Sequence, residues 1–164
     1  GPAPLQRAQG SWGGYPNGKI GSGTDGYKTV LTPISSVSLS GCSGSISVPY
    51  LHPKAAAALK ALNDAYTEHF GYGLILESCY RTYDQQVWAY NCYTTGSCNN
   101  GNKAADPGTS NHGWGLAVDV AMTRYGGYDS PNYKWLKQYG KDFGFVAGVV
   151  SGEPWHIEYA RPVQ

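Results

Sequence analysis

The sequence has little charge and no long apolar run, and both absences exclude classes of protein. Charged residues make up only 14% of the 164 residues, against about 25% in a typical globular protein. The net charge is +1, whereas proteins that bind nucleic acids or membrane surfaces carry an excess of basic residues. No apolar run approaches the roughly 20 residues of a membrane-spanning helix. We therefore expect neither a nucleic-acid partner nor a membrane span.

Aromatic residues and glycine, by contrast, are plentiful. The chain contains 14 tyrosines and 5 tryptophans, which disordered chains rarely carry. Its 23 glycines and 10 prolines indicate many loops, although their share stays below the ~25–30% that is typical of disorder. A chain of this length can bury a core of its own. The composition predicts a compact, loop-rich globular domain, which we expect to be a monomer.

The four cysteines, Cys42, Cys79, Cys92 and Cys98, indicate disulfides rather than a structural zinc cluster. Such clusters usually contain cysteine pairs about two to four residues apart, and no pair here has that spacing. Four cysteines allow three pairings. We favour Cys92 with Cys98, which closes a short loop, and Cys42 with Cys79, which ties the N-terminal part to a core strand. Disulfides imply an oxidising compartment, so we expect a secreted, extracytoplasmic protein.

Local patterns predict helices in three places. The clearest helix covers residues 53–70, because Pro53 suits a first helical position, an alanine run follows, and Gly71 suits the position after the end. Its apolar residues recur at helical spacing and should face the core. Two further helices are expected to begin after N-caps at Asp84 and Ser130.

Strands are predicted over residues 73–79, 115–122 and 155–160, with a short peripheral strand within 29–50. These strands do not alternate regularly with the helices, which favours an α+β fold over a parallel α/β fold. The polar loop over 94–111 is long for a small domain, and such loops are often functional.

We divide the chain after residue 28. Residues 1–28 are rich in Gly, Pro and Ser without periodicity, and we expect a linker or an irregular arm. The first two residues, Gly1 and Pro2, are typical of the remnant left when a protease removes a tag, and we expect them to contribute nothing to the fold. Residues 29–164 are predicted to form a single domain.

Alternation along the last two predicted strands places an aspartate and a histidine where they can meet. On the first strand, Asp119 shares a face with small residues only. On the second strand, His156 shares a face with Glu158. The opposite faces are apolar and should pack in the core. If the two strands pair, Asp119 and His156 point from the same open side of the sheet, and His112, in the turn before its strand, can close over them.

Two imidazoles and a carboxylate are ligands that zinc accepts, and three protein ligands leave a fourth position open to water, as in catalytic zinc sites. We therefore predict one zinc ion bound by His112, Asp119 and His156. Glu153, three residues before His156, can reach this water without being a ligand. Because zinc lowers the pKa of bound water to about 7, Glu153 can act as the base and pass the proton to a leaving amine. Such a site hydrolyses amides.

Three motifs together resemble those of a known family. Ser-x-His-x6-Asp over residues 110–119, followed by Glu-x-x-His over 153–156, resembles the D-alanyl-D-alanine carboxypeptidase (VanY-like) family of zinc peptidases. The segment Ser-Cys-Tyr-Arg-Thr-Tyr-Asp-Gln-Gln over 78–86 is similar to the family's Ser-Gly-Tyr-Arg-Ser-Tyr-x-x-Gln block. Cys79 stands where the family has glycine, which fits a disulfide beside the site. The resemblance covers roughly residues 50–160.

The resemblance implies a fold, an activity and further site residues. The family fold, of the LAS type, is a small central antiparallel sheet with helices packed on one side and the zinc site on the open side. The implied substrate is the stem peptide of peptidoglycan, from which a D,D-carboxypeptidase releases the terminal D-Ala. Arg81 would stabilise the oxyanion or hold a substrate carbonyl or carboxylate. Ser110 and Gln86 would hydrogen-bond the C-terminal end of the peptide, with Glu153 as the base, and we expect Trp155 to line the cleft.

Several alternatives stay open at this point. Ser110 can equally cap a turn, Gln86 can lie on an exposed helix face, and Glu158 can either lie behind the metal ligands or be a solvated carboxylate. An endopeptidase of the L-alanyl-D-glutamate type, as in phage lysins, would use the same residues with an open cleft end. A non-catalytic zinc-containing binding module would keep the ligands and lack turnover, although both Glu153 and Arg81 are present.

Overall fold

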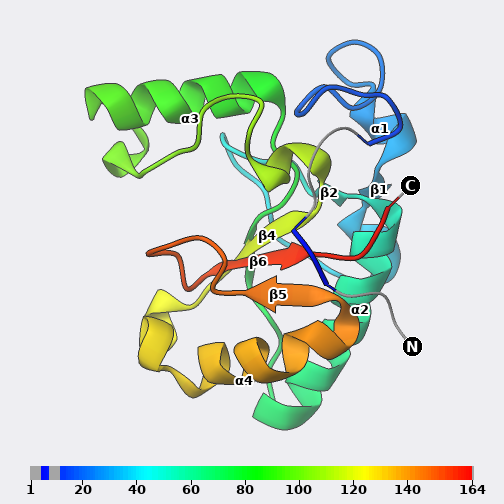
Figure 1. The fold of residues 1–164 in the computed structure, drawn as a ribbon, viewed down its shortest axis with the longest axis vertical. Coiled ribbons are helices and arrows are strands. Elements are labelled where there is room, and N and C mark those ends of the chain that lie inside the picture. The colour runs from blue at the N-terminus through cyan, green and yellow to red at the C-terminus, as the bar shows by residue number, and fades with distance from the viewer. Residues whose placement is uncertain (1–4, 8–11, 164) are drawn as a thin grey trace.

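The computed structural model describes residues 5–7 and 12–163, and its centre is a four-stranded antiparallel sheet (Figure 1). In spatial order the strands are β3 (Leu76–Ser78), β4 (Ala117–Val120), β6 (His156–Tyr159) and β5 (Phe145–Ala147). A second sheet pairs only β1 (Thr32–Pro33) and β2 (Tyr50–Leu51). The predicted α+β class with a small antiparallel sheet is confirmed.

The helices lie mainly behind and beside this sheet. They are α1 (Tyr27–Val30), α2 (Pro53–Phe70), α3 (Tyr83–Thr95) and α4 (Pro131–Tyr139). Short 3-10 turns are found at Ile34–Val37, Asn99–Gly101, Asn111–Trp114, Thr123–Tyr125, Gly127–Asp129 and Gly140–Phe143. α2 lies behind the sheet, α4 runs below β5, and α3 extends from the opposite end (Figure 1). Within the described ranges, no helix is both long enough and apolar enough to cross a membrane.

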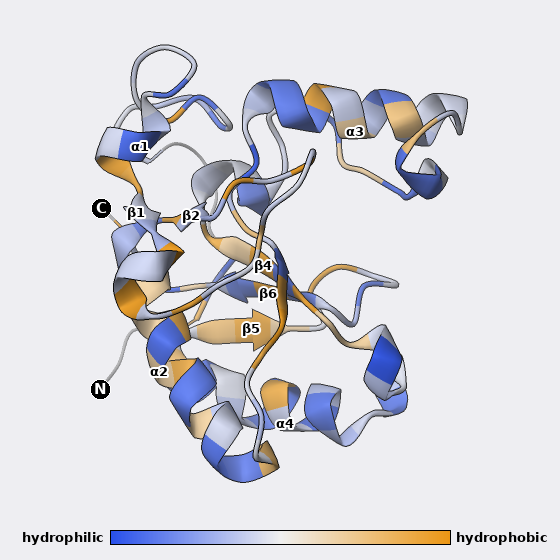
Figure 2. Ribbon diagram, turned by 180° about the vertical axis from the view of Figure 1, so that it is seen from behind, coloured by the Kyte–Doolittle hydropathy of each residue, from blue (hydrophilic) through white to orange (hydrophobic). Residues whose placement is uncertain are grey.

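One hydrophobic core joins α2 to the back of the sheet. Leu59 and Leu62 of α2 belong to the same buried cluster as Val118 and Val120 of β4, and all four side chains are fully buried. Hydrophobic residues accordingly gather on β4 and β5 and along parts of α2 (Figure 2). Because the core covers one face of the sheet, the other face is free to carry polar side chains.

α2 has the predicted bounds, and both of its ends are capped. His52 is the N-cap, and its Nδ1 accepts a hydrogen bond from the backbone N–H of Lys54 at 3.1 Å. Pro53 occupies the first turn, where its missing N–H costs nothing. Gly71 ends the helix with φ at 82°, a left-handed conformation that glycine adopts without strain.

The predicted N-cap of α3, Asp84, is wrong. The N-cap is Thr82, whose side chain accepts from the backbone N–H of Gln85 at 3.1 Å, while the Gln85 side chain accepts from the Thr82 N–H at 3.0 Å. This reciprocal capping box satisfies two N–H groups of the first turn at once. The predicted N-cap of α4, Ser130, is confirmed.

The strands are shorter than predicted. The ranges 73–79, 115–122 and 155–160 contain β3, β4 and β6 respectively, each of three or four residues. β5 was not predicted, because three residues directly after Gly144 are too few to show alternation. The range 29–50 contains β1 and the first residue of β2, each only two residues long.

The segment before α1 packs against the domain although it has little regular structure. Ile20 and Tyr27 are buried in the core, and residues 12–26 form no more than an isolated bridge. Gly1 and Pro2 lie outside the described residues. The division of the chain after residue 28 stays a prediction.

Both favoured disulfides are present. Cys42 is bonded to Cys79 and Cys92 to Cys98. The first bond joins the segment before α2 to the residue that follows β3, and the second joins the end of α3 to the turn after it. All four cysteines are therefore used.

Candidate metal centre and active-site cleft

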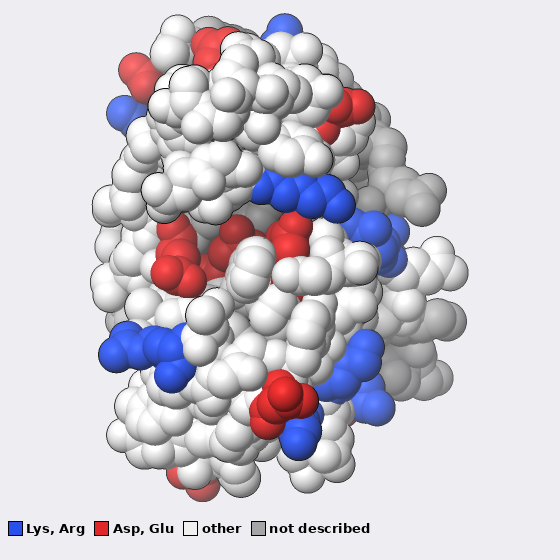
Figure 3. Space-filling view, turned by 90° about the vertical axis from the view of Figure 1, so that its left-hand side faces the viewer, with Lys and Arg blue, Asp and Glu red and all other residues white. Residues whose placement is uncertain are grey.

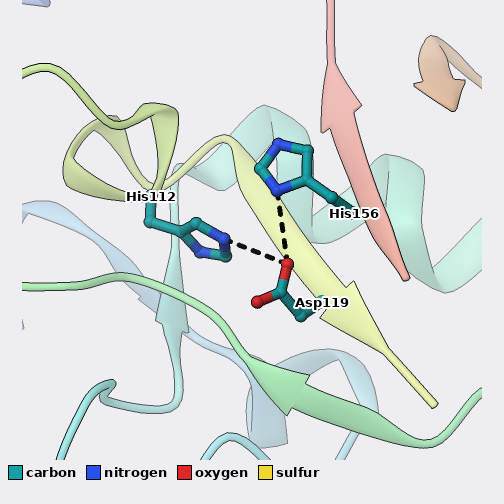
Figure 4. A group of neighbouring side chains, drawn as sticks. All are labelled: His112, Asp119 and His156. Carbon is teal, nitrogen blue, oxygen red and sulfur yellow. Dashed lines mark hydrogen bonds and ion pairs between the residues drawn. The ribbon is translucent and has the colours of Figure 1, made fainter. Parts of the chain in front are cut away.

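Three side chains meet on the free face of the sheet: His112, Asp119 and His156 (Figure 4). Asp119 on β4 and His156 on β6 lie directly opposite each other in the antiparallel register. His112 comes from the 3-10 turn just before β4. Nε2 of His112 lies 3.2 Å, and Nδ1 of His156 3.3 Å, from the same Oδ1 atom of Asp119. Because the candidate ligand atoms all lie within 4.8 Å of one another, one metal ion can contact all three.

The predicted alternation of β4 and β6 accounts for this meeting. Val118 and Ile157 are each adjacent to a site residue and point into the core, with 0% and 1% of their surface exposed. The side chain of Asp119 is 17% exposed, so it is reached from the opposite, open side. Alternate side chains therefore face the core and the site on both strands, as the two-residue period of a β-strand requires.

A backbone carbonyl orients His112. Its Nδ1 lies 2.8 Å from the carbonyl oxygen of Cys79. A carbonyl oxygen can only accept, so the neutral ring donates from Nδ1–H and directs the lone pair of Nε2 towards Asp119. Burial lowers the pKa of His112 and outweighs the opposing effect of Asp119. The ring is thus held in the neutral form that a metal ligand needs.

A buried carboxylate orients His156. Its Nε2 lies 2.8 Å from Oε1 of Glu158, whose side chain is fully buried. Its Nδ1, which faces Asp119, is buried and has no hydrogen-bond partner of good geometry among the described residues. Buried polar atoms are normally satisfied, and a metal ligand of this kind usually has its other ring nitrogen bonded to a carboxylate. The arrangement therefore fits a metal at Nδ1.

The charges of the cluster support the same conclusion. Burial alone lowers the pKa of His156, but the carboxylates of Asp119 and Glu158 outweigh it and raise the pKa to about 9. Burial raises the pKa of Asp119, but His112 and His156 reverse this effect and hold the pKa well below its usual range. Without a metal, the cluster thus binds a proton on His156 beside an ionised Asp119, and a cation can replace that proton.

Glu153 lies at the edge of the cluster, where a cleft opens. Its Oε1 is 3.7 Å from Nδ1 of His156, and its side chain is 23% exposed. The cleft has a volume of about 680 Å³ and is lined by parts of the segments 99–105 and 149–153. Figure 3 shows a hollow in which acidic side chains gather beneath a basic side chain on the rim. A substrate in this cleft therefore meets Glu153 and the candidate metal ligands together.

A sequence family described as "VanY: D-alanyl-D-alanine carboxypeptidase" matches residues 48–162. The chain belongs to this family. It is 30% identical over 128 residues to the carboxypeptidase-type protein YodJ of Bacillus subtilis (strain 168), a match that covers 67% of this chain and 46% of YodJ. The chain thus spans about half the length of this curated relative.

Two solved structures extend the family comparison to the fold. The LdcB LD-carboxypeptidase is 27% identical with a TM-score of 0.59, over 73% of this chain and 63% of that chain. VanYB in complex with D-alanine-D-alanine is 28% identical with a TM-score of 0.50, over 68% of this chain and 72% of that chain. The fold of VanY-type carboxypeptidases is therefore confirmed for this chain.

Arg81, from the segment over residues 78–86, is buried and lines the cleft. Its Nε donates to the carbonyl oxygen of Ile46 at 2.9 Å, its Nη1 to Oε1 of Gln86 at 3.0 Å and its Nη2 to Oγ of Ser78 at 3.1 Å. All three acceptors are neutral. Burial lowers the pKa of Arg81, but a guanidinium stays charged in proteins. The cleft wall thus holds a rigid cation that is available to an oxyanion or carboxylate.

The other three predicted substrate-binding residues have different positions. Gln86 is buried away from the cleft, because its Oε1 accepts from Arg81 and its Nε2 donates to the carbonyl oxygen of Ala105 at 2.8 Å. It therefore positions Arg81 rather than touching the cleft. Ser110 and Trp155 line the cleft. Ser110 also caps the 3-10 turn by accepting from a backbone N–H two residues further on, which was its alternative role.

Sequence reasoning left the position of Glu158 open and missed two of its partners. The structure buries Glu158 completely. Asn111 donates to its Oε2 at 2.8 Å, and Arg7 forms an ion pair with it. The shared face of Glu158 and His156 was a usable signal, since alternate strand residues point the same way. No sequence signal marks Arg7, which is 151 residues away.

Proposed function

We propose that this protein is a zinc-dependent D,D-carboxypeptidase that releases the terminal D-Ala of peptidoglycan stem peptides. The observation that carries the proposal is the convergence of His112 and His156 on one oxygen of Asp119, with Glu153 beside them in the cleft. Membership of the VanY family supports the reaction class. The related VanYB structure contains D-alanine-D-alanine, which supports the substrate.

The donor set supports one zinc ion held by His112, Asp119 and His156. Three ligands of nitrogen and carboxylate type with an open side are typical of catalytic zinc, whereas structural zinc is closed by four ligands. When bound, zinc would supply Lewis acidity and lower the pKa of a water molecule to about 7. The Nδ1 atom of His156, which is buried without a hydrogen bond of good geometry, supports this assignment.

The remaining steps belong to residues of the chain. Glu153 takes a proton from the attacking water and passes it to the amine of the leaving D-Ala, so that the peptide bond breaks and a carboxylate and an amine form. Arg81 stabilises the oxygen that becomes negative during the attack, or holds the C-terminal carboxylate of the substrate. Gln86 and Ser78 hold Arg81 in place. Ser110 and Trp155 line the space for the peptide.

An L,D-carboxypeptidase is the second candidate. It is favoured by the LdcB LD-carboxypeptidase, whose fold matches this chain with a TM-score of 0.59. The two activities differ in the residue that precedes the terminal D-Ala, which is D in one case and L in the other. A lysin-like endopeptidase and a non-catalytic zinc-binding module are further outcomes that the test below separates.

The disulfides support an extracytoplasmic location for this reaction. Both cysteine pairs are oxidised, and no cysteine is free, as is usual in secreted proteins. Peptidoglycan stem peptides are exposed in the same compartment. We assign the peptidase domain to residues 29–164 and expect it to act as a monomer.

Mass spectrometry of stem peptides tests the proposal. The protein is incubated with a pentapeptide that ends in D-Ala-D-Ala, with the tetrapeptide that ends in a single D-Ala, and with a cross-linked dimer, each with and without a chelator. We expect chelator-sensitive loss of one D-Ala from the pentapeptide. Loss from the tetrapeptide alone would assign an L,D-carboxypeptidase, and internal cleavage a lysin-like enzyme. Zinc binding without any cleavage would contradict an enzymatic function.

A further inference from the structure

Glu158 is a buried charge whose bonding capacity is fully used. Its Oε1 accepts from Nε2 of His156 at 2.8 Å and from Nη2 of Arg7 at 2.6 Å. Its Oε2 accepts from Nδ2 of Asn111 at 2.8 Å and from Nε of Arg7 at 2.9 Å. Arg7 therefore binds both oxygens at once, in the paired geometry that makes an Arg–carboxylate bond strong and directional.

Arg7 reaches this position from the N-terminal segment. The backbone N–H of Gln6 donates to the carbonyl oxygen of Ala160 at 3.0 Å, just beyond the end of β6. The side chain of Arg7 is 47% exposed and lines the cleft, whereas that of Glu158 is 0% exposed. In the described part of the chain, no other Lys or Arg lies within ion-pairing distance of Glu158.

We propose that Arg7 is a positioning residue for the metal site. It holds Glu158, and Glu158 in turn holds the ring of His156 so that Nδ1 faces Asp119. Removing one partner of a buried pair leaves an uncompensated charge. Without Arg7, the Glu158 carboxylate would turn towards the cleft and water, and the ring of His156 would lose its fixed direction. The inference rests on the metal-binding role of His156 in the proposed function.

This role enlarges the functional unit beyond the family domain. The VanY family match begins at residue 48, so it includes the ligands and Glu158 but lacks Arg7. The N-terminal segment therefore supplies a cation that the matched domain lacks at this position.

Zinc affinity, measured separately from catalysis, tests the inference. The variants are Arg7→Ala, Arg7→Lys, Glu158→Gln and the double variant Arg7→Ala/Glu158→Gln, with the exposed Arg124→Ala as the matched control. Competition with a chromogenic chelator gives the zinc dissociation constant. We expect Arg7→Ala to weaken zinc binding about tenfold, at the low end of the effect of removing such an outer partner. The zinc affinity of Arg7→Lys should lie between those of wild type and Arg7→Ala, because lysine keeps the charge but not the paired geometry.

Two further readouts separate positioning from other roles. The double variant should bind zinc no more weakly than Glu158→Gln, because the two residues act in one chain of contacts. With cobalt(II) in place of zinc, the visible absorption of Arg7→Ala should shift, while that of Arg124→Ala should match wild type. Thermal denaturation of the metal-free proteins checks that each variant folds.

The measured zinc affinity and KM can each contradict the positioning role of Arg7. Zinc affinity of Arg7→Ala within twofold of wild type would overturn the inference, and so would an increase in KM at unchanged zinc affinity, which indicates substrate contact instead. A wild-type protein that binds no zinc overturns both this inference and the proposed function. A wild-type protein that binds zinc through Arg7-dependent contacts but cleaves no peptide leaves the inference standing and removes the function alone.

Discussion

The Oδ1 atom of Asp119 is the point on which the site is organised. Two imidazole nitrogens lie 3.2 Å and 3.3 Å from it, and each ring is held from behind by a different acceptor. His112 is held by the carbonyl of Cys79 and His156 by the carboxylate of Glu158. Both rings therefore have their free nitrogen directed at the same position before any metal binds, which is the preorganisation that a metal ligand set requires.

His156→Ala should remove zinc binding, because it deletes one of three ligands and leaves Asp119 and His112 alone. Elemental analysis of the purified variant, dialysed against buffered zinc, should show a zinc content near zero where wild type shows one ion per chain. His69→Ala is the matched control, since His69 lies on α2, away from the cluster. An unchanged zinc content in His156→Ala would disprove the ligand assignment.

Glu153→Gln should separate metal binding from catalysis. The variant keeps the size and hydrogen bonding of the side chain but cannot accept a proton, so kcat should fall by about 10²–10⁴-fold, the usual contribution of a general base. Zinc content should stay at the wild-type level, because Glu153 is not one of the three candidate ligands. Both quantities are measured on one preparation. Turnover at the wild-type rate would exclude Glu153 as the base.

Elements of the fold determine which residues meet. Two of these elements, α2 and β3, also contain features that affect the stability of the protein. α2 starts from an N-cap that works only when His52 is neutral, because its Nδ1 accepts a hydrogen bond. The end of β3 is tied by a disulfide at Cys79, the same residue whose carbonyl orients His112. The stability of these two elements therefore bears directly on the geometry of the site.

Because the N-cap of α2 is a histidine, we predict that the stability of the protein falls in acid. Burial and the neighbouring Lys54 lower the pKa of His52 to about 4. Between pH 6.5 and 4 the unfolded chain therefore binds a proton that the folded chain does not, so stability falls as the pH falls. His52→Asn keeps a capping acceptor without titrating. From pH 7 to pH 4, wild type should lose about 3 kcal/mol more unfolding free energy than this variant. Urea denaturation at both pH values measures the difference, and equal losses would contradict it.

The two disulfides should differ in their contribution to stability. On chain-entropy grounds, a bond that spans 37 residues stabilises by about 4 kcal/mol and one that spans 6 residues by about 2 kcal/mol. Cys42→Ser/Cys79→Ser should therefore lower the urea midpoint more than Cys92→Ser/Cys98→Ser. The Cys42→Ser/Cys79→Ser variant should also bind zinc more weakly, because the lost bond no longer fixes the backbone at residue 79, whose carbonyl orients His112. The reverse order of midpoints would show that local strain or residual structure dominates.

Elements with a clear period could be predicted from the sequence, and contacts between distant segments could not. Alternation predicted which residues of β4 and β6 face the site, whereas the pairing of these two strands was an assumption. The helix α2 followed from its proline, alanine run and glycine. β5 was not predicted, because a strand of three residues is too short to show a period. The cap at Thr82 was missed because Thr82 and Asp84 are only two positions apart and both residue types serve as N-caps. The pair of Arg7 and Glu158 joins segments 151 residues apart, and nothing local to either residue indicates it.

At the scale of the whole molecule, the core behind the sheet leaves one open face, and the loops around that face form the cleft. The segments 99–105 and 149–153 line it, and the first of these contains the turn that follows the Cys92–Cys98 bond. The N-terminal segment adds Arg7 beside the metal ligands. Parts that are remote in sequence are thus combined in a single site of a VanY-family chain.

Metal titration of the apo-protein tests whether hydrolysis depends on one zinc ion per chain. The chain is stripped with a chelator, and zinc is added back in known amounts while release of D-Ala from the pentapeptide is followed. We predict no activity without metal, and a linear recovery that ends at one zinc per chain. Full activity in the stripped protein, or recovery that requires a different number of ions, would contradict it.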